Sequence, residues 1–551
     1  MRSKTEKTLI VGLDGLSWEV IDRLIDIGKL KTIKSLMDDG VYGVLSSVEP
    51  SISPTAWASF LTGKEPKTHG IFGFTTGDNT YARNIPVCAK NIEEEKIHEI
   101  LSNNGKKVGL LNVPMTYPPE AINGFIVSGL ETPSKKSNYT YPEQEKLEIE
   151  EKIGEYFLDI EISRDDNKLK DADYLSNYYS DSYRLFFEDL EKVTKKRLQA
   201  FLYLVDKYNP DLSMIVFTGT DRIQHVLWHY IKGIVKNEKR KIETKIIQYY
   251  ELVDQSISKL ISQNGGYENI FIISDHGFGE LQGDFYINVW LKNEGYMKLD
   301  RLKSSSVFGT AKNMVKKLGV KRELLEKLVG RNKIEKITGE GSLIDWKGTK
   351  AYNYGWNGIR INLVDREMEG SVDINEYHNV CDQIEKQIYE LKCRITGKPI
   401  VKNVLINRDL DSVKVDQKSP DIYLEMADAP HYTCVNVDIN RQDIFGKNMW
   451  KTGEHRKEGI IVAKGKAVAR RHRIDKCNLI DIMPTILYCY KQEIPRNVDG
   501  RILKEILRNE ILTTHKEVYR QEVRNSTNVD EIYSDQELED VTQRLKDLGY
   551  L

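Results

Sequence analysis

Five short, almost wholly apolar runs recur along the chain, and each gives way to a loop rich in Gly, Asp, Asn or Pro. They are TLIVGLDG, KKVGLLNVP, SMIVFTGTD, NIFIISDHG and EGIIVAKG. Runs of this length without polar alternation are typical of strands that are buried on both faces. Helical patterns lie between them, for example Lys195–Asp211 before the third run. Strand alternating with helix predicts an α/β fold with a mostly parallel central sheet flanked by helices.

Two stretches interrupt this pattern. Residues 134–192 are rich in Lys, Glu, Asp and Tyr, and residues 302–340 are rich in Lys, with little strand character in either. We interpret both as insertions, which either cap the functional site or form solvated helical decoration. The predicted organisation is a catalytic core in three parts, 1–133, 193–301 and 341–510, with a charged helical tail at 511–551.

The tail ends in SDQELEDVTQRLKDLGYL. Ser534 is a good helix start, and apolar residues follow it at helical spacing, namely Leu538, Val541, Leu545 and Leu548. We expect a helix that docks on the core and has no chemistry of its own.

Composition excludes several classes of function. The 551 residues include 81 Lys and Arg against 83 Asp and Glu, a net charge of −2 without the polybasic signature of nucleic-acid or membrane-surface binding. The first apolar run is too short for a signal peptide, and no stretch reaches the length of a membrane span, so we expect no membrane segment. Six cysteines without Cys-x-x-Cys spacing are expected to be reduced, mostly buried thiols of a cytoplasmic protein. No pattern fixes the oligomeric state.

Acidic and imidazole side chains follow the predicted strands. Asp14 ends the first run, Asp221 and His225 follow the third, Asp275 and His276 follow the fourth, and His455 precedes the fifth. Each residue alone has a plainer reading as a helix cap, turn or loop residue. The carboxyl ends of parallel strands meet at one edge, however, and three carboxylates with three imidazoles would stay unsatisfied there without a cation. The set predicts a metal centre, and these ligands suit Zn or Mn.

A hydroxyl is also placed for chemistry in the stretch SISPTAWASFLTG. Ser53 suits a helix cap and Pro54 the first turn, which puts Thr55 at a helix N-terminus. Backbone N–H groups and the helix dipole favour an anion there, and a hydroxyl activated by a metal can attack phosphorus. The alternative is that Thr55 only caps the helix.

Seven motifs then occur in order between Leu13 and about Gly500: GLDG, SPTAWASFLTGKEPKTHGIFGF, NVPMTYPPEAINGFIVSGLETPS, FTGTDRIQH, SDHGFG, TGEHRKEGIIVAKG and DIMPTILYCYKQEIPRNVDG. Together they resemble the alkaline phosphatase superfamily, in its predicted phosphohydrolase/phosphomutase branch close to the type I phosphodiesterases/nucleotide pyrophosphatases. The resemblance implies an alkaline-phosphatase-like fold and a site with two divalent ions. It implies one ion held by Asp221, His225 and His455, and another held by Asp14, Asp275 and His276. Thr55 would join the second ion as the nucleophile of a phosphothreonine intermediate.

The sequence departs from its relatives at one place. Nucleotide pyrophosphatases have an Asn after the His-Gly that follows the nucleophile, where it contacts the phosphate, and here Phe74 occupies that place. Asn112 is a possible substitute donor, or else a turn residue before Pro114. A sulfatase is disfavoured, because Thr55 does not match the Cys/Ser-x-Pro-x-Arg setting of sulfatases.

The leading hypothesis is a two-metal-dependent phosphodiesterase or phosphohydrolase acting on a small phosphate ester or a nucleotide-like substrate. The first alternative is a phosphomonoesterase or a phosphoglycerate-mutase-like phosphotransferase, although such mutases use Ser as nucleophile. A catalytically silent metal-binding protein is the other alternative, and the complete set of six ligands argues against it.

Overall fold

The computed structural model describes residues 7–77, 84–160, 172–234, 241–300, 343–416, 419–436, 439–521 and 533–550. The chain forms two compact units, each with its own hydrophobic core. The first unit comprises Met1–Phe74, Pro86–Glu280 and Trp450–Leu551, and the second comprises Thr75–Ile85 and Leu281–Met449.

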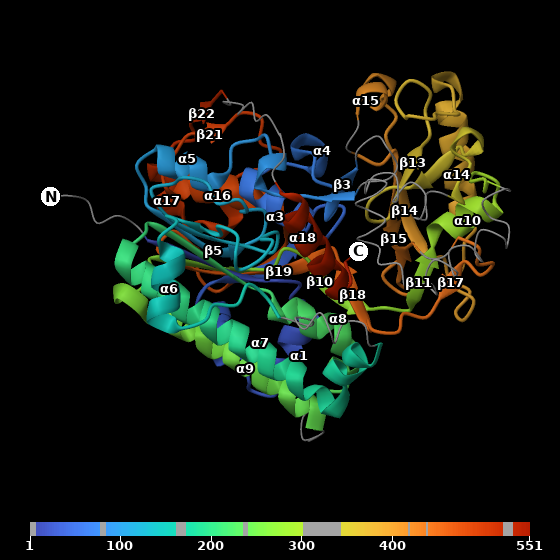
Figure 1. The fold of residues 1–551 in the computed structure, drawn as a ribbon. Coiled ribbons are helices and arrows are strands. Elements are labelled where there is room, and N and C mark those ends of the chain that lie inside the picture. Colours follow the sequence, from blue (N-terminus) through green and yellow to red (C-terminus); the bar gives the residue numbers. More distant parts are fainter. Residues whose placement is uncertain are drawn as a thin grey trace. The chain divides into compact units, whose positions relative to one another are not determined.

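A nine-stranded sheet forms the centre of the first unit (Figure 1). Its strand order is β20 (His472–Asn478), β2 (Val41–Ser46), β19 (Glu458–Gly465), β9 (Asn269–Ile273), β1 (Thr8–Leu13), β8 (Leu212–Phe217), β5 (Val108–Val113), β6 (Gly124–Ser128) and β7 (Thr140–Tyr141). The five neighbours from β9 to β6 are parallel. Strand β19 is antiparallel to β9 and β2, and β7 is antiparallel to β6. The predicted mostly parallel sheet is confirmed.

Helices cover both faces of this sheet, which explains the apolar runs without alternation. Leu9 and Val11 of β1 pack with α1 (Trp18–Asp26), α2 (Lys31–Asp39), α7 (Ala172–Tyr208) and α9 (Lys241–Ser262). Ile10, between them in sequence, packs on the opposite side with α3 (Ser53–Thr62), α5 (Ile97–Asn103) and α16 (Ile482–Cys489). Both sides of each central strand are therefore core.

The second unit is built differently, from mostly antiparallel strands, with β11 and β16 as its parallel pair. Its larger sheet has the order β12 (Ala351–Asn353), β13 (Gly358–Ile361), β15 (Ile422–Met426) and β14 (Val401–Ile406), and its smaller sheet joins β16 (Tyr432–Val435), β11 (Gly283–Tyr286) and β17 (Phe445–Gly446). Helices α10 (Ile287–Asn293), α14 (Tyr377–Tyr389) and α15 (Leu410–Val415) belong to the same unit.

The second unit introduces a domain boundary that the sequence patterns do not predict. The sequence predicts that 193–301 and 341–510 belong to the catalytic core, whereas Leu281–Met449 forms a compact unit with its own hydrophobic core. The strand β15 alternates buried and half-buried residues, as antiparallel strands with one covered face do. A search for uninterrupted apolar runs misses such strands. The predicted insertion 302–340 lies outside the described residues.

The described part of the other predicted insertion belongs to the first unit. It contains β7, the helix α6 (Glu145–Ile153) and the first half of α7. Shorter elements of the chain are α4 (Pro66–His69), α17 (Asn509–Thr514), β3 (Thr75–Gly77), β4 (Asn84–Pro86), β21 (Ile494–Pro495) and β22 (Tyr519–Arg520). The predicted C-terminal helix is confirmed as α18 (Asp535–Asp547), which Ser534 caps in a capping box with Glu537.

Two further expectations concern cysteines and membranes. All six cysteines lie in the described ranges, and each is buried and free of a disulfide. Among the described helices, none combines the length and the apolar character that crossing a bilayer requires.

Strand register places the predicted ligands at one edge of the sheet. Leu13 of β1 pairs with Phe217 of β8, and Gly12 pairs with Ile273 of β9, so the three strands end level with one another. The chain continues from β8 into α8 (Gly219–Ile231), and from β9 into β10 (Gly277–Glu280). Strand β10 pairs with β18 (Gly453–Arg456), which places His455 opposite Phe278.

A buried carboxyl group beyond β6 makes stability depend on pH. Glu131 is 4% exposed, and its Oε2 accepts a hydrogen bond of 2.8 Å from the N–H of Met115. Its Oε1 has no hydrogen-bond partner among the described residues. Burial raises the pKa of Glu131 from 4.5 to about 7, so the folded state holds a proton that the unfolded state releases.

We expect the free energy of unfolding to fall as the pH rises from the unfolded pKa of 4.5 to the folded pKa of about 7. Glu131→Gln should remove this contribution, matching the unmodified protein near pH 4.5. Above pH 7 the variant should be more stable by up to about 3 kcal/mol, since one pKa unit corresponds to about 1.4 kcal/mol. Denaturant unfolding across this range measures the effect, with the exposed Glu539→Gln as control. Parallel curves for Glu131→Gln and the unmodified protein would contradict the prediction.

Candidate metal centre

The first group of predicted ligands comes together around one carboxylate oxygen. The Nε2 atoms of His225 and His455 lie 3.4 Å and 3.2 Å from Oδ1 of Asp221, and 3.0 Å from each other. Helix α8 supplies Asp221 and His225 one turn apart, and β18 supplies His455. All three side chains are buried, and their ligand atoms lie within 4.8 Å of one another.

The second group lies beside the first. The Nε2 of His276 is 3.6 Å from Oδ1 of Asp14 and 3.4 Å from Oδ2 of Asp275. The ligand atoms again lie within 4.8 Å of one another, and all three residues are buried. The rings of His276 and His455 stack at a centroid distance of 3.9 Å, so the two groups adjoin. The structure thus brings together all six predicted ligands.

Two of the three histidines, His225 and His276, present lone pairs rather than protons to these groups. Nδ1 of His225 lies 3.1 Å from the carbonyl of Gly453, and Nδ1 of His276 lies 3.1 Å from the carbonyl of Gly277. A carbonyl only accepts, so Nδ1 has the proton and Nε2 is free to bind a cation. Burial lowers the pKa of His225 to about 3, which keeps its ring neutral at pH 7.

The carboxylates, by contrast, are under electrostatic strain. Burial, reinforced by Asp275 and Asp221, raises the pKa of Asp14 well above its ordinary value. Burial also raises the pKa of Asp275 to about 7. Oδ1 of Asp221 and Oδ2 of Asp275 have no hydrogen-bond partner among the described residues. Buried carboxylates in contact with imidazole lone pairs fit divalent cations, and the donor set suits Zn or Mn.

Asp221 differs from the other two acids because a cation already faces it. Burial opposes its ionisation, but His225, His455 and Arg222 together hold its pKa well below the ordinary value. Since His225 stays neutral, the lasting cationic partner is Arg222, whose Nη1 lies 2.6 Å from Oδ2 of Asp221. The ionised Asp221 therefore keeps its Oδ1 for the ligand group.

The two hydroxyls at the start of α3 lie in different surroundings. Ile52, not Ser53, is the N-cap, so the prediction that Ser53 caps the helix is wrong. The Oγ of Ser53 instead donates to Oδ1 of Asp14 at 3.3 Å and lies 3.4 Å from Nε2 of His276. The Oγ1 of Thr55 is buried without a hydrogen-bond partner among the described residues. Ser53, rather than Thr55, contacts the second ligand group.

The predicted substrate contacts lie in different surroundings. The side-chain amide of Asn112 donates to the carbonyl of Val216 at 3.2 Å, within the sheet. Phe74 is buried and stacks on Tyr550 at a centroid distance of 4.2 Å. A contact of Asn112 or Phe74 with substrate stays a prediction.

The centre also contains residues that the strand-end pattern does not predict. Glu454 is 1% exposed, and its Oε1 lies 3.7 Å from Nδ1 of His225 and 3.6 Å from Nε2 of His455. Its position directly before a predicted ligand was an available signal. Tyr550 has its hydroxyl 2.7 Å from Oδ2 of Asp221, and no strand-end pattern marks a residue so far along the chain.

One protein family matches the chain over most of its length. A sequence profile described as "Type I phosphodiesterase / nucleotide pyrophosphatase" matches residues 8–455. A search of curated protein sequences finds no match. Similar solved structures include human ectonucleotide pyrophosphatase/phosphodiesterase 5, at 13% identity and a TM-score of 0.48, covering 92% of this chain and 100% of that one. Another is phosphonoacetate hydrolase from Sinorhizobium meliloti 1021 with phosphonoformate, at 12% identity and a TM-score of 0.49, covering 87% and 94%.

We expect the protein to bind two divalent ions per chain after dialysis against Zn or Mn. His225→Ala should lose mainly the ion of the first group, and His276→Ala mainly that of the second, because each removes one of three ligands. Elemental analysis after gel filtration measures the stoichiometry, and the exposed His472→Ala is the control. Chelation should lower the melting temperature, since bound ions stabilise the folded state. Full occupancy in both variants would refute the ligand assignment.

Proposed function

The chain belongs to the type I phosphodiesterase/nucleotide pyrophosphatase family of the alkaline phosphatase superfamily, and we propose that it is a two-metal-dependent phosphodiesterase of small or nucleotide-like phosphate esters. Family membership makes it a phosphoester hydrolase. The observation that supports the finer proposal is the contact of a helix-terminal hydroxyl with one of two adjoining ligand groups.

Each ligand group would hold one ion, Zn or Mn by its donors. Asp221, His225 and His455 would hold the first. The second would lie between Asp14 on one side and Asp275 with His276 on the other. When bound, two divalent ions would supply positive charge beside the phosphoryl group and favour the ionised form of a nearby hydroxyl.

Ser53 is the hydroxyl that we assign as nucleophile. Its proton is directed at Asp14, which leaves the oxygen lone pairs for an incoming phosphorus. Attack passes the hydroxyl proton to Asp14 and forms the bond between Oγ and phosphorus, while the bond from phosphorus to one alcohol of the diester breaks and that alcohol leaves with a proton. The other alcohol stays on phosphorus, and water then hydrolyses this seryl phosphodiester to release a phosphate monoester and restore Ser53. The first turn of α3 offers backbone N–H groups to the phosphoryl oxygens.

The helix geometry favours Ser53 over Thr55 for this role. Ser53 and Thr55 are two residues apart, which is a rotation of about 200° around a helix axis. Because Ser53 contacts Asp14 and His276, Thr55 projects from nearly the opposite side. A phosphothreonine on Thr55, which the sequence favoured, is the alternative outcome of the same experiment.

We expect Ser53→Ala to lower turnover of a diester at least about a hundredfold with both metal sites loaded, because it removes the nucleophile. Thr55→Ala is the matched control two residues away, and its turnover should stay within about fivefold. Ser53→Thr should keep measurable activity, since it retains a hydroxyl. Mass spectrometry of protein quenched during turnover should find the phosphoryl group with its remaining ester on Ser53. The reverse ranking of the two alanine variants, with this adduct on Thr55, would make Thr55 the nucleophile.

A serine nucleophile also strengthens the second candidate, a phosphomonoesterase or a phosphotransferase. We expect bis(p-nitrophenyl) phosphate to have a higher kcat/KM than p-nitrophenyl phosphate with the Zn- or Mn-loaded protein. The opposite order would indicate a monoesterase. Absence of turnover of either ester by the metal-loaded protein would indicate a silent metal-binding protein.

A further inference from the structure

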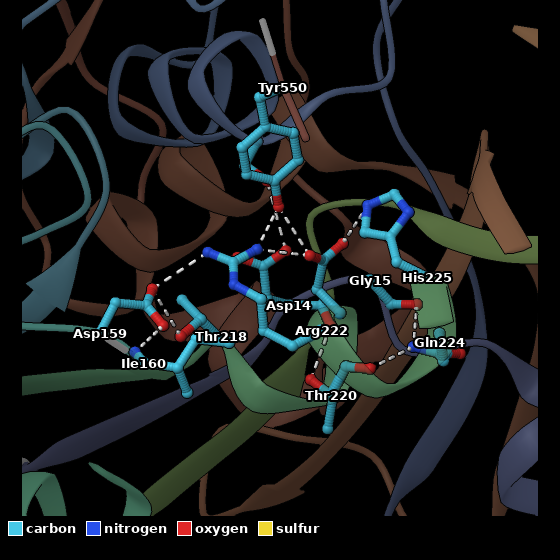
Figure 2. A network of polar contacts seen from close by, with 12 residues as sticks. Asp14, Gly15, Asp159, Ile160, Thr218, Thr220, Arg222, Gln224, His225 and Tyr550 are labelled. Atoms are coloured by element: carbon cyan, nitrogen blue, oxygen red, sulfur yellow. Dashed lines mark hydrogen bonds and ion pairs between the residues drawn. The ribbon is translucent and has the colours of Figure 1, made fainter. Parts of the chain in front are cut away.

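The C-terminal segment reaches into the metal centre through one side chain. Tyr550 is 5% exposed, and Figure 2 shows its hydroxyl pointing toward Arg222 with Asp14 beside it. The Tyr550 hydroxyl lies 2.7 Å from Oδ2 of Asp221, and Nη1 of Arg222 also donates to it. This contact joins residues that are 329 positions apart in the chain.

The direction of these hydrogen bonds follows from chemistry. A guanidinium only donates, so the Tyr550 oxygen accepts from Arg222, and its single proton goes to Asp221. Oδ2 of Asp221 thus accepts from both Arg222 and Tyr550. Oδ1 is left for the ligand group with His225 and His455. The hydrogen bonds to one oxygen fix the direction in which the other oxygen points.

The end of α18 is built to deliver this side chain. The N–H of Tyr550 bonds to the carbonyl of Leu545, and the N–H of Gly549 bonds to the carbonyl of Lys546. Gly549 has a φ of 77°, a left-handed conformation that side chains other than glycine rarely adopt. These features form a Schellman motif, which turns the chain back at the helix end and sends Tyr550 inward.

Helix α18 is anchored to the rest of the first unit. Arg544 donates to the carbonyls of Thr132 and Pro133. Val541 and Leu545 are buried, so the apolar face of α18 is covered. Docking of α18 therefore determines where the Tyr550 side chain lies.

Two aromatic contacts also fix the position of the Tyr550 ring. It stacks on Phe74 at 4.2 Å with an interplanar angle of 15°, and it meets His225 edge-on at 5.9 Å. Phe74 thus orients a tyrosine rather than presenting an amide to the site. The ring is held independently of its hydroxyl, which makes removal of the hydroxyl alone a clean experiment.

We propose that Tyr550 is a positioning residue of the metal centre, which orients the Asp221 carboxylate through its hydroxyl and couples metal binding to the docking of α18. This inference rests on the metal ions of the proposed function. Partners that orient a ligand side chain typically change metal affinity by about 10- to 100-fold. Tyr550 is expected to act through Asp221 without itself binding metal or substrate.

The test is the metal affinity of Tyr550→Phe, measured by equilibrium titration of the metal-free protein with Zn or Mn. Phenylalanine keeps the ring on Phe74 and removes only the hydroxyl. We expect one of the two ions to bind about 10- to 100-fold more weakly and the other to be unchanged. Turnover at limiting metal should fall and should be restored by excess metal, whereas a purely structural defect would not be rescued.

The matched control is Tyr533→Phe in the same segment. Tyr533 stacks on Tyr117 at 5.7 Å, and its hydroxyl donates to the carbonyl of Glu131, where it helps to anchor the segment without contacting a ligand. This control should bind both ions as the unmodified protein does. Gly549→Ala provides a second test of the inference. Strain at the helix end should misplace Tyr550 and weaken the binding of the same ion.

Unchanged affinity for both ions in Tyr550→Phe overturns the inference, even if the protein is an active phosphodiesterase. Increased turnover in Tyr550→Phe with unchanged affinity also overturns it, and would make the segment a cover over the site. Weakened binding of one ion in a protein without esterase activity supports the inference and refutes the proposed function. A protein that binds no divalent ion at all overturns both.

Discussion

The level ending of three neighbouring parallel strands is the constraint on which the site depends. Pairing of β1 with β8 and β9 leaves Asp14, Asp221 and Asp275 at one edge of the sheet, all buried. Three carboxylates so placed repel one another, and burial with this repulsion raises the pKa values of two of them. Around these acids, His225 and His276 direct their Nε2 lone pairs inward, and Arg222 forms an ion pair with Asp221. Added positive charge would relieve the repulsion between the carboxylates.

The arginine is itself held in place by a buried network (Figure 2). Nη2 of Arg222 lies 3.0 Å from Oδ2 of Asp159, which also accepts from the hydroxyl of Thr218 at 3.2 Å. Arg197 donates to that hydroxyl at 2.7 Å. Arg222 and Arg197 outweigh burial and hold the pKa of Asp159 below its ordinary value. Asp159 belongs to the predicted insertion 134–192. This insertion therefore supplies a buried ion pair that holds Arg222, and it is more than solvated decoration.

The sequence predicted the sheet and the six ligands because both depend on local patterns. Apolar runs such as the one before Asp14 report burial on two faces, and the polar residue after each run reports the strand end. The second unit escaped prediction because its strands are half-buried and alternate. The choice between Ser53 and Thr55 depends on which hydroxyl lies against Asp14, a tertiary contact that no local pattern of the sequence encodes. Tyr550 could not be found locally, since only the tertiary docking of α18 brings it to Asp221.

The use of a phenol beside Asp221 has a physical reason. Arg222 already places one positive charge on Oδ2 of this carboxylate. A second cation there would draw electron density from Asp221 and repel a divalent ion at Oδ1. The Tyr550 hydroxyl adds a hydrogen bond without adding charge, so it fixes the carboxylate and leaves its attraction for a cation intact. Asp159 lies on the other side of Arg222, where its negative charge offsets the positive charge of the guanidinium. The geometry of Asp221 is therefore held from two directions without a second positive charge beside its ligand group.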